Sequence, residues 1–250
     1  MATNYIENQV IDQFKNRETF TREELLAFYR AYDPEMNDGT FGWKIYDLKK
    51  KRLIEPVKKG VYSLVNKKNF KPELDATILN IAGVLQNAFA HHFYNIWNTA
   101  WLNEFTELQT TSSLIIVETD RDSMERIFFL LKDKQMNVYF KPDANVIEKY
   151  ISEDKEAIII KPMITRAPVN TIRKVMIPSL EKMLVDLFCD EKIFYAYQGK
   201  QLVRIFESAF GKYIINLSRM LNYAKRRKRE EGLKDFLIKN LPDNLKTLIE

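Results

Sequence analysis

The sequence predicts a mixed α+β and α/β protein of two parts, a small N-terminal unit at residues 1–68 and a larger α/β domain at residues 69–250. Three observations support this prediction. Two amphipathic helical segments near the N-terminus precede two short extended runs, three apolar runs alternate with helical segments, and the last third has helical spacing only. The larger domain should therefore contain a small, mainly parallel sheet and a helical C-terminal third.

The N-terminal unit should begin with two helices. Residues 4–15 place three apolar side chains on one helical face. A second helix should start at Thr21, because Glu24 follows three residues later and the two can form a capping box. This helix should end at Asp33, since the residue before a proline is disfavoured in the α conformation.

A third helix and a hairpin complete the unit. Thr40 is expected to cap a helix in which apolar residues recur at i, i+4 and i+7. Two extended runs follow at residues 53–57 and 61–65, joined by Lys58-Lys59-Gly60, whose glycine can adopt a positive φ. Two helices followed by a hairpin are the plan of a winged helix-turn-helix.

Positive charge is concentrated in the second half of this unit. Residues 44–68 contain nine Lys or Arg and two acidic residues, a net charge of +7, against +5 for the whole chain. Basic residues on the third helix and the hairpin tip would meet the phosphates of a DNA duplex. The residues expected to contact DNA are Thr40, Trp43, Lys44, Lys50, Lys51, Lys58 and Lys59.

Other interpretations of this surface stay open. The basic residues 49–52 could be a solvated helix end that the helix dipole stabilises. Asp47 falls on the face expected to meet DNA, where it must accept a hydrogen bond from a base or be repelled. Winged helices also act as protein-interaction modules, in which case the basic surface would meet an acidic partner.

The overall composition is that of a globular protein. The 250 residues are 46% hydrophobic and 29% charged, and the sequence pI of about 9.0 is compatible with a polyanionic partner. The single cysteine, Cys189, excludes an internal disulfide. The N-terminus lacks a signal-peptide pattern, and no window approaches the roughly 18 apolar residues of a membrane span. We therefore expect a cytoplasmic protein without membrane contact.

The larger domain should open with a helix from Leu74 to about Phe89. His91 and His92 follow it, but adjacent histidines project in different directions and the chain has no third histidine, so a metal role is disfavoured. Spacings of three and four then predict a buried helix face formed by Phe93, Tyr94, Trp97, Trp101 and Phe105.

The middle of the chain changes to a strand pattern. Compact apolar runs predict buried strands at residues 114–117, 137–140 and 157–160. A helix capped by Asp122 or Ser123 separates the first two runs, and a short helix from Asp143 follows the second. This alternation predicts a parallel sheet covered by helices.

The remainder is predicted to be mainly helical, after an edge strand near residues 173–177. In the helix that follows, Lys182 and Asp186 are four residues apart and should pair on its outer side. Further helices are predicted at residues 201–210, 213–229 and 233–241. The basic run 225–229 could be a second contact with phosphates or an acidic partner, or a solvated helix end.

The sequence has no catalytic signature that we recognise. Cys189 has no basic neighbour in the sequence, which favours an ordinary half-buried thiol. Glu118, Asp120 and Asp122 follow a predicted strand and could hold Mg²⁺ in a metal-dependent nucleic-acid-processing enzyme. The simpler interpretation is a strand end followed by a helix cap. We therefore expect no enzyme, no metal and no cofactor.

Two sets of segments carry a resemblance to a known family. In the N-terminal unit they are Thr21-Arg22-Glu23-Glu24-Leu25-Leu26, Leu48, Leu53-Ile54, Val57 and Gly60-Val61-Tyr62. In the second half they are residues 115–118 (IIVE), 160–162 (IKP) and 177–188 (IPSLEKMLVDLF). In this order they resemble AbiEi-type antitoxins of type IV (abortive infection) toxin–antitoxin systems. One departure is that relatives often place a glycine where this chain has Lys51-Arg52.

The resemblance implies a two-part regulator. The winged helix would bind inverted repeats in its own promoter and repress transcription, and the second domain would counteract a nucleotidyltransferase toxin. This chain lacks the Gly-Ser dipeptide that such a toxin would carry, which agrees with the antitoxin side. The expected function is a non-enzymatic DNA-binding transcriptional regulator, with double-stranded DNA and a nucleotidyltransferase-type toxin as partners.

Overall fold

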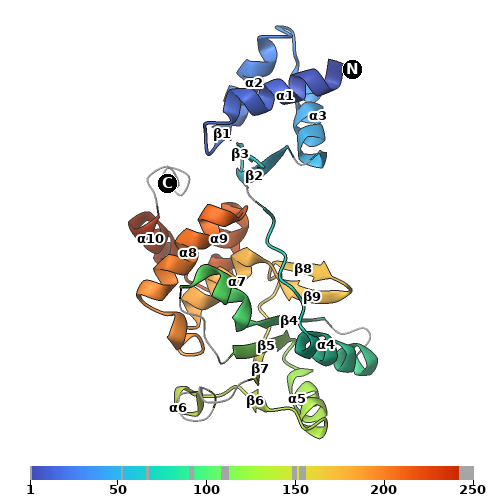
Figure 1. Ribbon diagram of the computed structural model, residues 1–250, viewed down its shortest axis with the longest axis vertical. Helices are drawn as coiled ribbons and strands as arrows, with labels where there is room; N and C mark the ends of the chain where they lie inside the picture. Colours follow the sequence, from blue (N-terminus) through green and yellow to red (C-terminus); the bar gives the residue numbers. More distant parts are fainter. Residues whose placement is uncertain are drawn as a thin grey trace.

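The computed structural model has a mixed α and β fold with several small sheets, as the sequence predicts (Figure 1). It describes residues 2–51, 53–65, 68–89, 93–107, 113–147, 151 and 156–241. The described residues form two hydrophobic cores, one within the N-terminal helices and hairpin and a larger one beneath them. His91 and His92 lie outside the described residues.

The N-terminal unit combines three helices with a small antiparallel sheet. The helices are α1 (Ala2–Phe14), α2 (Arg22–Arg30) and α3 (Asp38–Lys50). The strands are β1 (Phe20–Thr21), β2 (Ile54–Lys58) and β3 (Val61–Leu64), in the order β1-β3-β2. The three helices and the β2–β3 hairpin agree with the sequence prediction. Strand β1 is not predicted, because two residues are too few to show an alternating pattern.

Polar side chains cap the N-termini of two of these helices. The Thr21 hydroxyl accepts a hydrogen bond from the Glu24 amide at 3.1 Å, and the Thr21 amide donates to the Glu24 carboxylate at 2.8 Å. This confirms the predicted capping box. The cap predicted at Thr40 is wrong: Asn37 Oδ1 accepts from the Thr40 amide at 2.9 Å and starts α3 earlier. Asparagine is among the best N-cap residues, so the helix begins at the first suitable position.

The larger domain is built around a four-stranded sheet. Its strands are β4 (Tyr94–Asn98), β5 (Ser113–Thr119), β6 (Val138–Phe140) and β7 (Glu156–Pro162), in the order β4-β5-β7-β6. The three strands that the sequence predicts are parallel to one another, and β4 is antiparallel to β5. Helix α4 (Ala76–Ala88) packs against β4, and α5 (Met124–Asp133) packs against β6 and β7.

The predicted aromatic helix at residues 93–105 is wrong. Residues Tyr94–Asn98 form strand β4, and a 3₁₀ helix, η1 (Thr99–Phe105), follows it. All five residues of β4 are buried, the two asparagines included, so the strand lacks the regular alternation of apolar and polar residues that marks a half-buried strand. The spacing of three and four arises from aromatic residues divided between a strand and the turn after it.

The edge strand predicted near residues 173–177 is half of a hairpin. Strands β8 (Val169–Ile172) and β9 (Val175–Pro178) pair in antiparallel register, and β9 packs against β4. Arg173 and Lys174 form the turn with φ of 46° and 66°. Tight hairpin turns of this kind usually contain glycine or asparagine, so the sequence carries no turn signal here.

The other α-helices of the described chain are the short α6 (Ala144–Val146), α7 (Leu180–Cys189), α8 (Lys200–Lys212), α9 (Leu217–Arg226) and α10 (Glu230–Asn240). Helix α9 is shorter at both ends than the helix predicted at residues 213–229. It begins late because the Asn216 side chain accepts a hydrogen bond from the Arg219 amide and caps the helix there. Among the described residues no helix combines the length and apolar character needed to cross a membrane.

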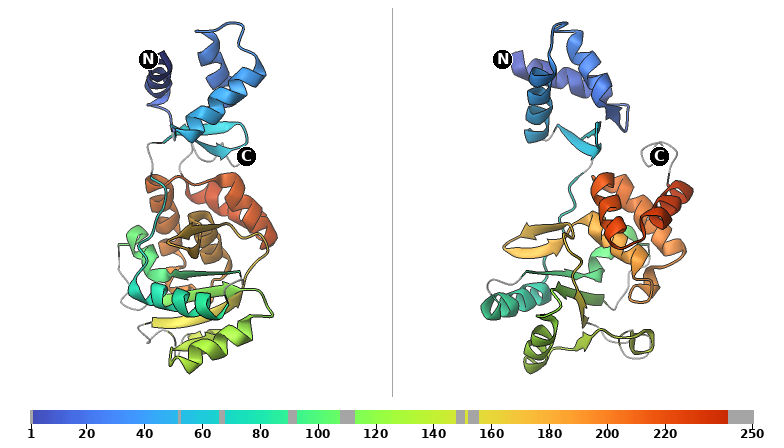
Figure 2. Two further views of the ribbon diagram at one scale, coloured as in Figure 1. Left: turned by 90° about the vertical axis from the view of Figure 1, so that its right-hand side faces the viewer. Right: turned by 180° about the vertical axis from the view of Figure 1, so that it is seen from behind.

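The N-terminal hairpin is seated on the larger domain (Figures 1 and 2). Strand β2 contacts α9, and the Val57 side chain is buried in the larger hydrophobic core. The connecting segment is held by backbone hydrogen bonds, from the Lys68 amide to the Lys212 carbonyl at 3.4 Å and from the Ile214 amide to the Lys68 carbonyl at 3.1 Å. The hairpin is therefore part of the contact between the two halves as well as of the N-terminal unit.

Gly60 is the position where the hairpin depends on a glycine. Its φ is 77°, and its carbonyl accepts the Arg22 amide at the start of α2. Gly60→Ala should lower the free energy of unfolding by about 1–2 kcal/mol, because an L side chain is strained at positive φ. Gly83→Ala, within α4 and with no atom near the added Cβ, is the matched control and should raise it by up to ~1 kcal/mol. Urea unfolding measures both changes, and equal shifts would contradict the assigned turn.

Candidate functional site

The outward face of α3 carries an exposed aromatic pair. The Trp43 side chain is 72% exposed and Tyr46 is 55% exposed, although both are large aromatic residues. Their ring centroids are 5.6 Å apart at an interplanar angle of 84°, an edge-to-face arrangement. Thr40, one helical turn before Trp43, is also exposed. The opposite face of the helix is fixed to the core by Phe41, Ile45 and Leu48, as its spacing predicts.

Lysines surround this pair. Lys50 is exposed and Lys44 half-buried, and both lie on the outward side of α3 at helical spacing from Thr40. Lys49 lies closer to the sheet, with its Nζ 5.0 Å from the centre of the Tyr62 ring on β3. Of the seven residues predicted to meet DNA, the structure thus brings Thr40, Trp43, Lys44 and Lys50 onto one face.

Lys51 is held differently from the other predicted contacts. Its Nζ is 2.7 Å from Asp47 Oδ2 and 2.5 Å from Glu7 Oε1 of α1. Hydrogen bonds to Asp47 and then Glu7 raise the pKa of the Lys51 ammonium. Lys51 is therefore directed towards α1 and balances the negative charge of Asp47 beside the outward face.

The hairpin tip supplies further positive charge close to the larger domain. Lys59 is exposed in the turn that it forms with Gly60, and Lys58, the last residue of β2, is half-buried. The neighbouring Val57 is buried in the larger core, so the tip lies next to that domain. The tip and α3 are parts of the same unit, which stands above the larger domain in Figure 2.

The three carboxylates at the end of strand β5 do not converge. Glu118 is fully buried and paired with Lys182, and its Oε2 accepts a hydrogen bond from Asn95 at 2.9 Å. Asp120 Oδ1 accepts from the Ser123 amide at 2.9 Å, and Asp122 is exposed. Ser123, one of the two predicted cap residues, is the N-cap of α5, although its side chain makes no capping hydrogen bond. Within the described ranges no group of three His, Cys, Asp or Glu is placed to hold a metal ion.

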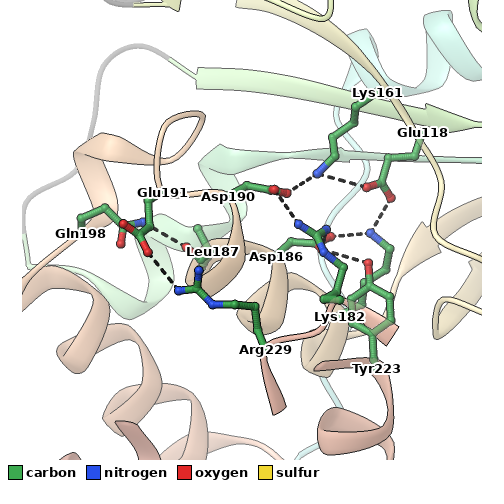
Figure 3. A network of polar contacts seen from close by, with 11 residues as sticks. Glu118, Lys161, Lys182, Asp186, Leu187, Asp190, Glu191, Gln198, Tyr223 and Arg229 are labelled. Atoms are coloured by element: carbon green, nitrogen blue, oxygen red, sulfur yellow. Dashed lines mark hydrogen bonds and ion pairs between the residues drawn. The ribbon is translucent and has the colours of Figure 1, made fainter. Parts of the chain in front are cut away.

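Glu118 belongs instead to a buried ion-pair network (Figure 3). Glu118 and Lys161 face each other on the parallel strands β5 and β7, with Lys161 Nζ 3.5 Å from Glu118 Oε1. Lys182 of α7 reaches Glu118 from the other side and also lies 2.5 Å from Asp186 Oδ2. The sheet and α7 are therefore joined by charged groups rather than by apolar contact alone.

Helix α9 closes the network from the opposite side. Arg227, the residue after α9, lies 2.9 Å from Asp186 Oδ1 and 2.5 Å from Asp190 Oδ1. The Tyr223 hydroxyl donates to Asp186 Oδ1 at 2.9 Å, and Lys161 pairs with Asp190. Three carboxylates meet three cations, so the network as a whole carries no net charge.

The surroundings of these groups set their pKa values. Burial by itself would raise the pKa of the Asp186 carboxyl, but the positive charges of Lys182, Lys161 and Arg227 outweigh it and the pKa is lowered. Burial, and then the neighbouring Asp186, raises the pKa of Tyr223. Burial also raises the pKa of the Cys189 thiol to about 11, which agrees with the expected half-buried, unreactive cysteine.

Two sequence predictions are corrected here. Lys182 and Asp186 do pair, but in the core rather than on an outer side, because every residue from Leu180 to Leu187 is buried. The basic run 225–229 is only partly solvated: Arg227 is in the network, Arg226 donates to the Thr165 carbonyl and Arg229 pairs with Glu191. A signal existed in the apolar runs that directly precede Glu118 and Lys161, since a charge placed there needs a partner.

Removing one member of the network should be costly. Lys182→Met keeps most of the side-chain volume but leaves Glu118 and Asp186 without their shared cation, so the free energy of unfolding should fall by about 3–5 kcal/mol. Lys234→Met removes a partly exposed pair with Glu230 and Glu231 and should change the free energy of unfolding far less, because solvent screens such pairs. Denaturant unfolding compares them, and similar losses would show that the network contributes little.

The network should also make stability depend on pH. A carboxyl whose folded pKa is lowered stabilises the folded state above its unfolded pKa of about 4, and this contribution is lost as the pH falls through the folded value. The destabilisation by Asp186→Asn should therefore be large at pH 7 and shrink towards pH 3. The exposed Asp235→Asn should show a small difference throughout. Thermal unfolding between pH 7 and pH 3 measures both, and a constant Asp186→Asn penalty would contradict the assignment.

Comparison with known proteins adds a family. No curated protein shows significant similarity to the chain. The family model described as "Family of unknown function (DUF6577)" matches residues 40–243, which include most of α3, the hairpin and the whole ion-pair network. The match spans well over half of the sequence, and the chain belongs to the DUF6577 family.

Proposed function

We propose that this protein is a DNA-binding transcriptional regulator in which the N-terminal unit acts as a winged helix-turn-helix. In this proposal α3 enters the major groove of a duplex, and the hairpin tip contacts the adjacent backbone. The observation that carries the proposal is the outward face of α3, where Thr40, Trp43, Lys44 and Lys50 are grouped on a helix whose other side is anchored in the core.

Two further observations support this interpretation. The ion pair between Lys51 and Asp47 reduces the repulsion that an unpaired carboxylate would exert on phosphates. Lys59, at the hairpin tip of the same unit, is exposed. Lys51 itself is left out of the proposed contacts, because Glu7 and Asp47 already hold its ammonium group.

The metal-dependent enzyme is the less favoured alternative. Its carboxylates would have to be Glu118, Asp120 and Asp122, but Glu118 is enclosed between Lys182 and Lys161 while Asp122 is exposed. A magnesium ion would have to displace a buried lysine to reach Glu118. A calorimetric titration with Mg²⁺ or Mn²⁺ that releases no heat discards this alternative.

The antitoxin part of the proposal is supported by the resemblance to AbiEi-type proteins alone. Its test is direct: a nucleotidyltransferase encoded beside this gene should lose its toxicity when it is co-expressed with the full chain. A neighbouring nucleotidyltransferase that remains toxic on co-expression would contradict it.

Duplex binding should depend on salt through the α3 lysines. The full chain should bind a fluorescent mixed-sequence duplex of about 30 base pairs, with an affinity that falls steeply as salt rises, because each phosphate contact releases counterions. Lys44→Ala/Lys50→Ala should reduce the slope of log K against log salt by about 0.9 for each lost contact. Lys134→Ala/Lys192→Ala, which removes two exposed lysines of the larger domain, should leave the slope unchanged.

A failure of the full chain to bind any duplex at low salt would overturn the DNA-binding proposal. That result would favour a protein-interaction module whose basic surface meets an acidic partner.

The hairpin tip has a separate test. Lys59→Ala should lower the same slope by about 0.9 if the tip grips the backbone. An unchanged slope would remove the tip from the interface while leaving α3 in place. The measurement is fluorescence anisotropy over a series of salt concentrations.

A further inference from the structure

The outward face of α3 carries no arginine, asparagine or glutamine. Arginine makes bidentate contacts with guanine, and asparagine or glutamine makes them with adenine. Residues 38–50 contain none of these three residue types. Asn37, the residue before the helix, uses its side-chain oxygen to cap the Thr40 amide. Hydrogen-bonded base recognition by this helix is therefore limited to its lysines, Thr40 and Asp47, and its exposed apolar groups offer a second means of recognition.

What the face offers at its centre is apolar surface. Thr40, Trp43 and Tyr46 are exposed, between Lys44 on one side and Lys50 at the end of the helix. Asp47, one turn after Trp43, is paired with Lys51. The edge-to-face contact between the two rings, at 5.6 Å, holds each in place, so little conformational freedom is lost on binding. A rigid apolar ridge flanked by positive charge suits a target that is apolar locally and anionic around it.

The major groove presents one apolar group of this kind. Among the four bases, only thymine carries a methyl group, on C5, and this group projects into the major groove. We propose that the Trp43–Tyr46 pair, with Thr40, recognises the thymine C5-methyl group, so that the protein prefers duplexes that display methyl groups in the major groove. This inference rests on the proposed DNA-binding function and names the chemical group that the same surface reads.

The experiment compares duplexes that differ only in that methyl group. Poly(dA-dT) and poly(dA-dU) have the same hydrogen-bonding edges, and the second lacks the C5-methyl group. The full chain should bind poly(dA-dT) more tightly, by about fourfold for each methyl group buried. A second pair, poly(dG-dC) and poly(dG-5-methyl-dC), should show a preference of the same sign for the methylated polymer.

Variants assign the preference to the aromatic pair. Trp43→Ala should bring the ratio of the two affinities close to one while the salt dependence of binding remains, because the lysines are untouched. Trp43→Phe, which retains an aromatic ring, should keep part of the preference. Phe129→Ala removes a side chain that is 56% exposed on α5 of the larger domain, and it should leave the ratio unchanged.

The outcomes separate this inference from the function on which it rests. Salt-dependent binding with equal affinity for both members of each pair would overturn methyl recognition and leave the DNA-binding proposal standing. Tighter binding to single-stranded (dT)30 than to either duplex would also overturn it, because the rings would then act as a base-stacking platform. No binding to any of these polymers at low salt would overturn both proposals.

Discussion

One buried ammonium group joins the sheet of the larger domain to helix α7. Lys182 has no exposed surface and lies between Glu118 on the sheet and Asp186 on its own helix. A charge in such a position is tolerated only when its partners are present and well placed, so the positions of β5 and α7 are tied to each other. Arg227 pairs with Asp186 and so joins the end of α9 to the same network. The buried ion-pair network therefore links the sheet to two helices (Figure 3).

Every charged group of the network is paired with another member of it. Glu118 and Lys161 lie at the carboxyl ends of parallel strands, where α/β proteins commonly place their ligands. Here the charged groups neutralise one another, and the lowered pKa of Asp186 reflects cations that already surround it. These side chains join elements of the fold, whereas the proposed contacts with DNA lie on the N-terminal unit.

Helix α9 connects the two halves of the molecule physically. It contacts β2 of the N-terminal hairpin, and Tyr223 and Arg227 at its other end contribute to the ion-pair network. The hairpin tip is therefore positioned by a helix that is itself fixed by buried charges. In the proposed regulator, this arrangement would set the orientation of the hairpin relative to the larger domain, whereas α3 depends only on the smaller core.

Elements that are marked by a few neighbouring residues could be predicted from the sequence. The capping box of Thr21 and Glu24, the apolar stripe of α3 and the three parallel strands were predictable, because capping and periodicity act over a few residues. On the outward face of α3, helical spacing alone grouped Trp43, Tyr46, Asp47 and Lys50. Strand β4 within the aromatic segment could be recognised only from the fold, because a strand buried on both faces lacks the alternation of apolar and polar residues that would reveal it. It also decided that Lys182, Asp186 and Arg227 are buried partners, because charges far apart along the chain pair only when folding brings them together.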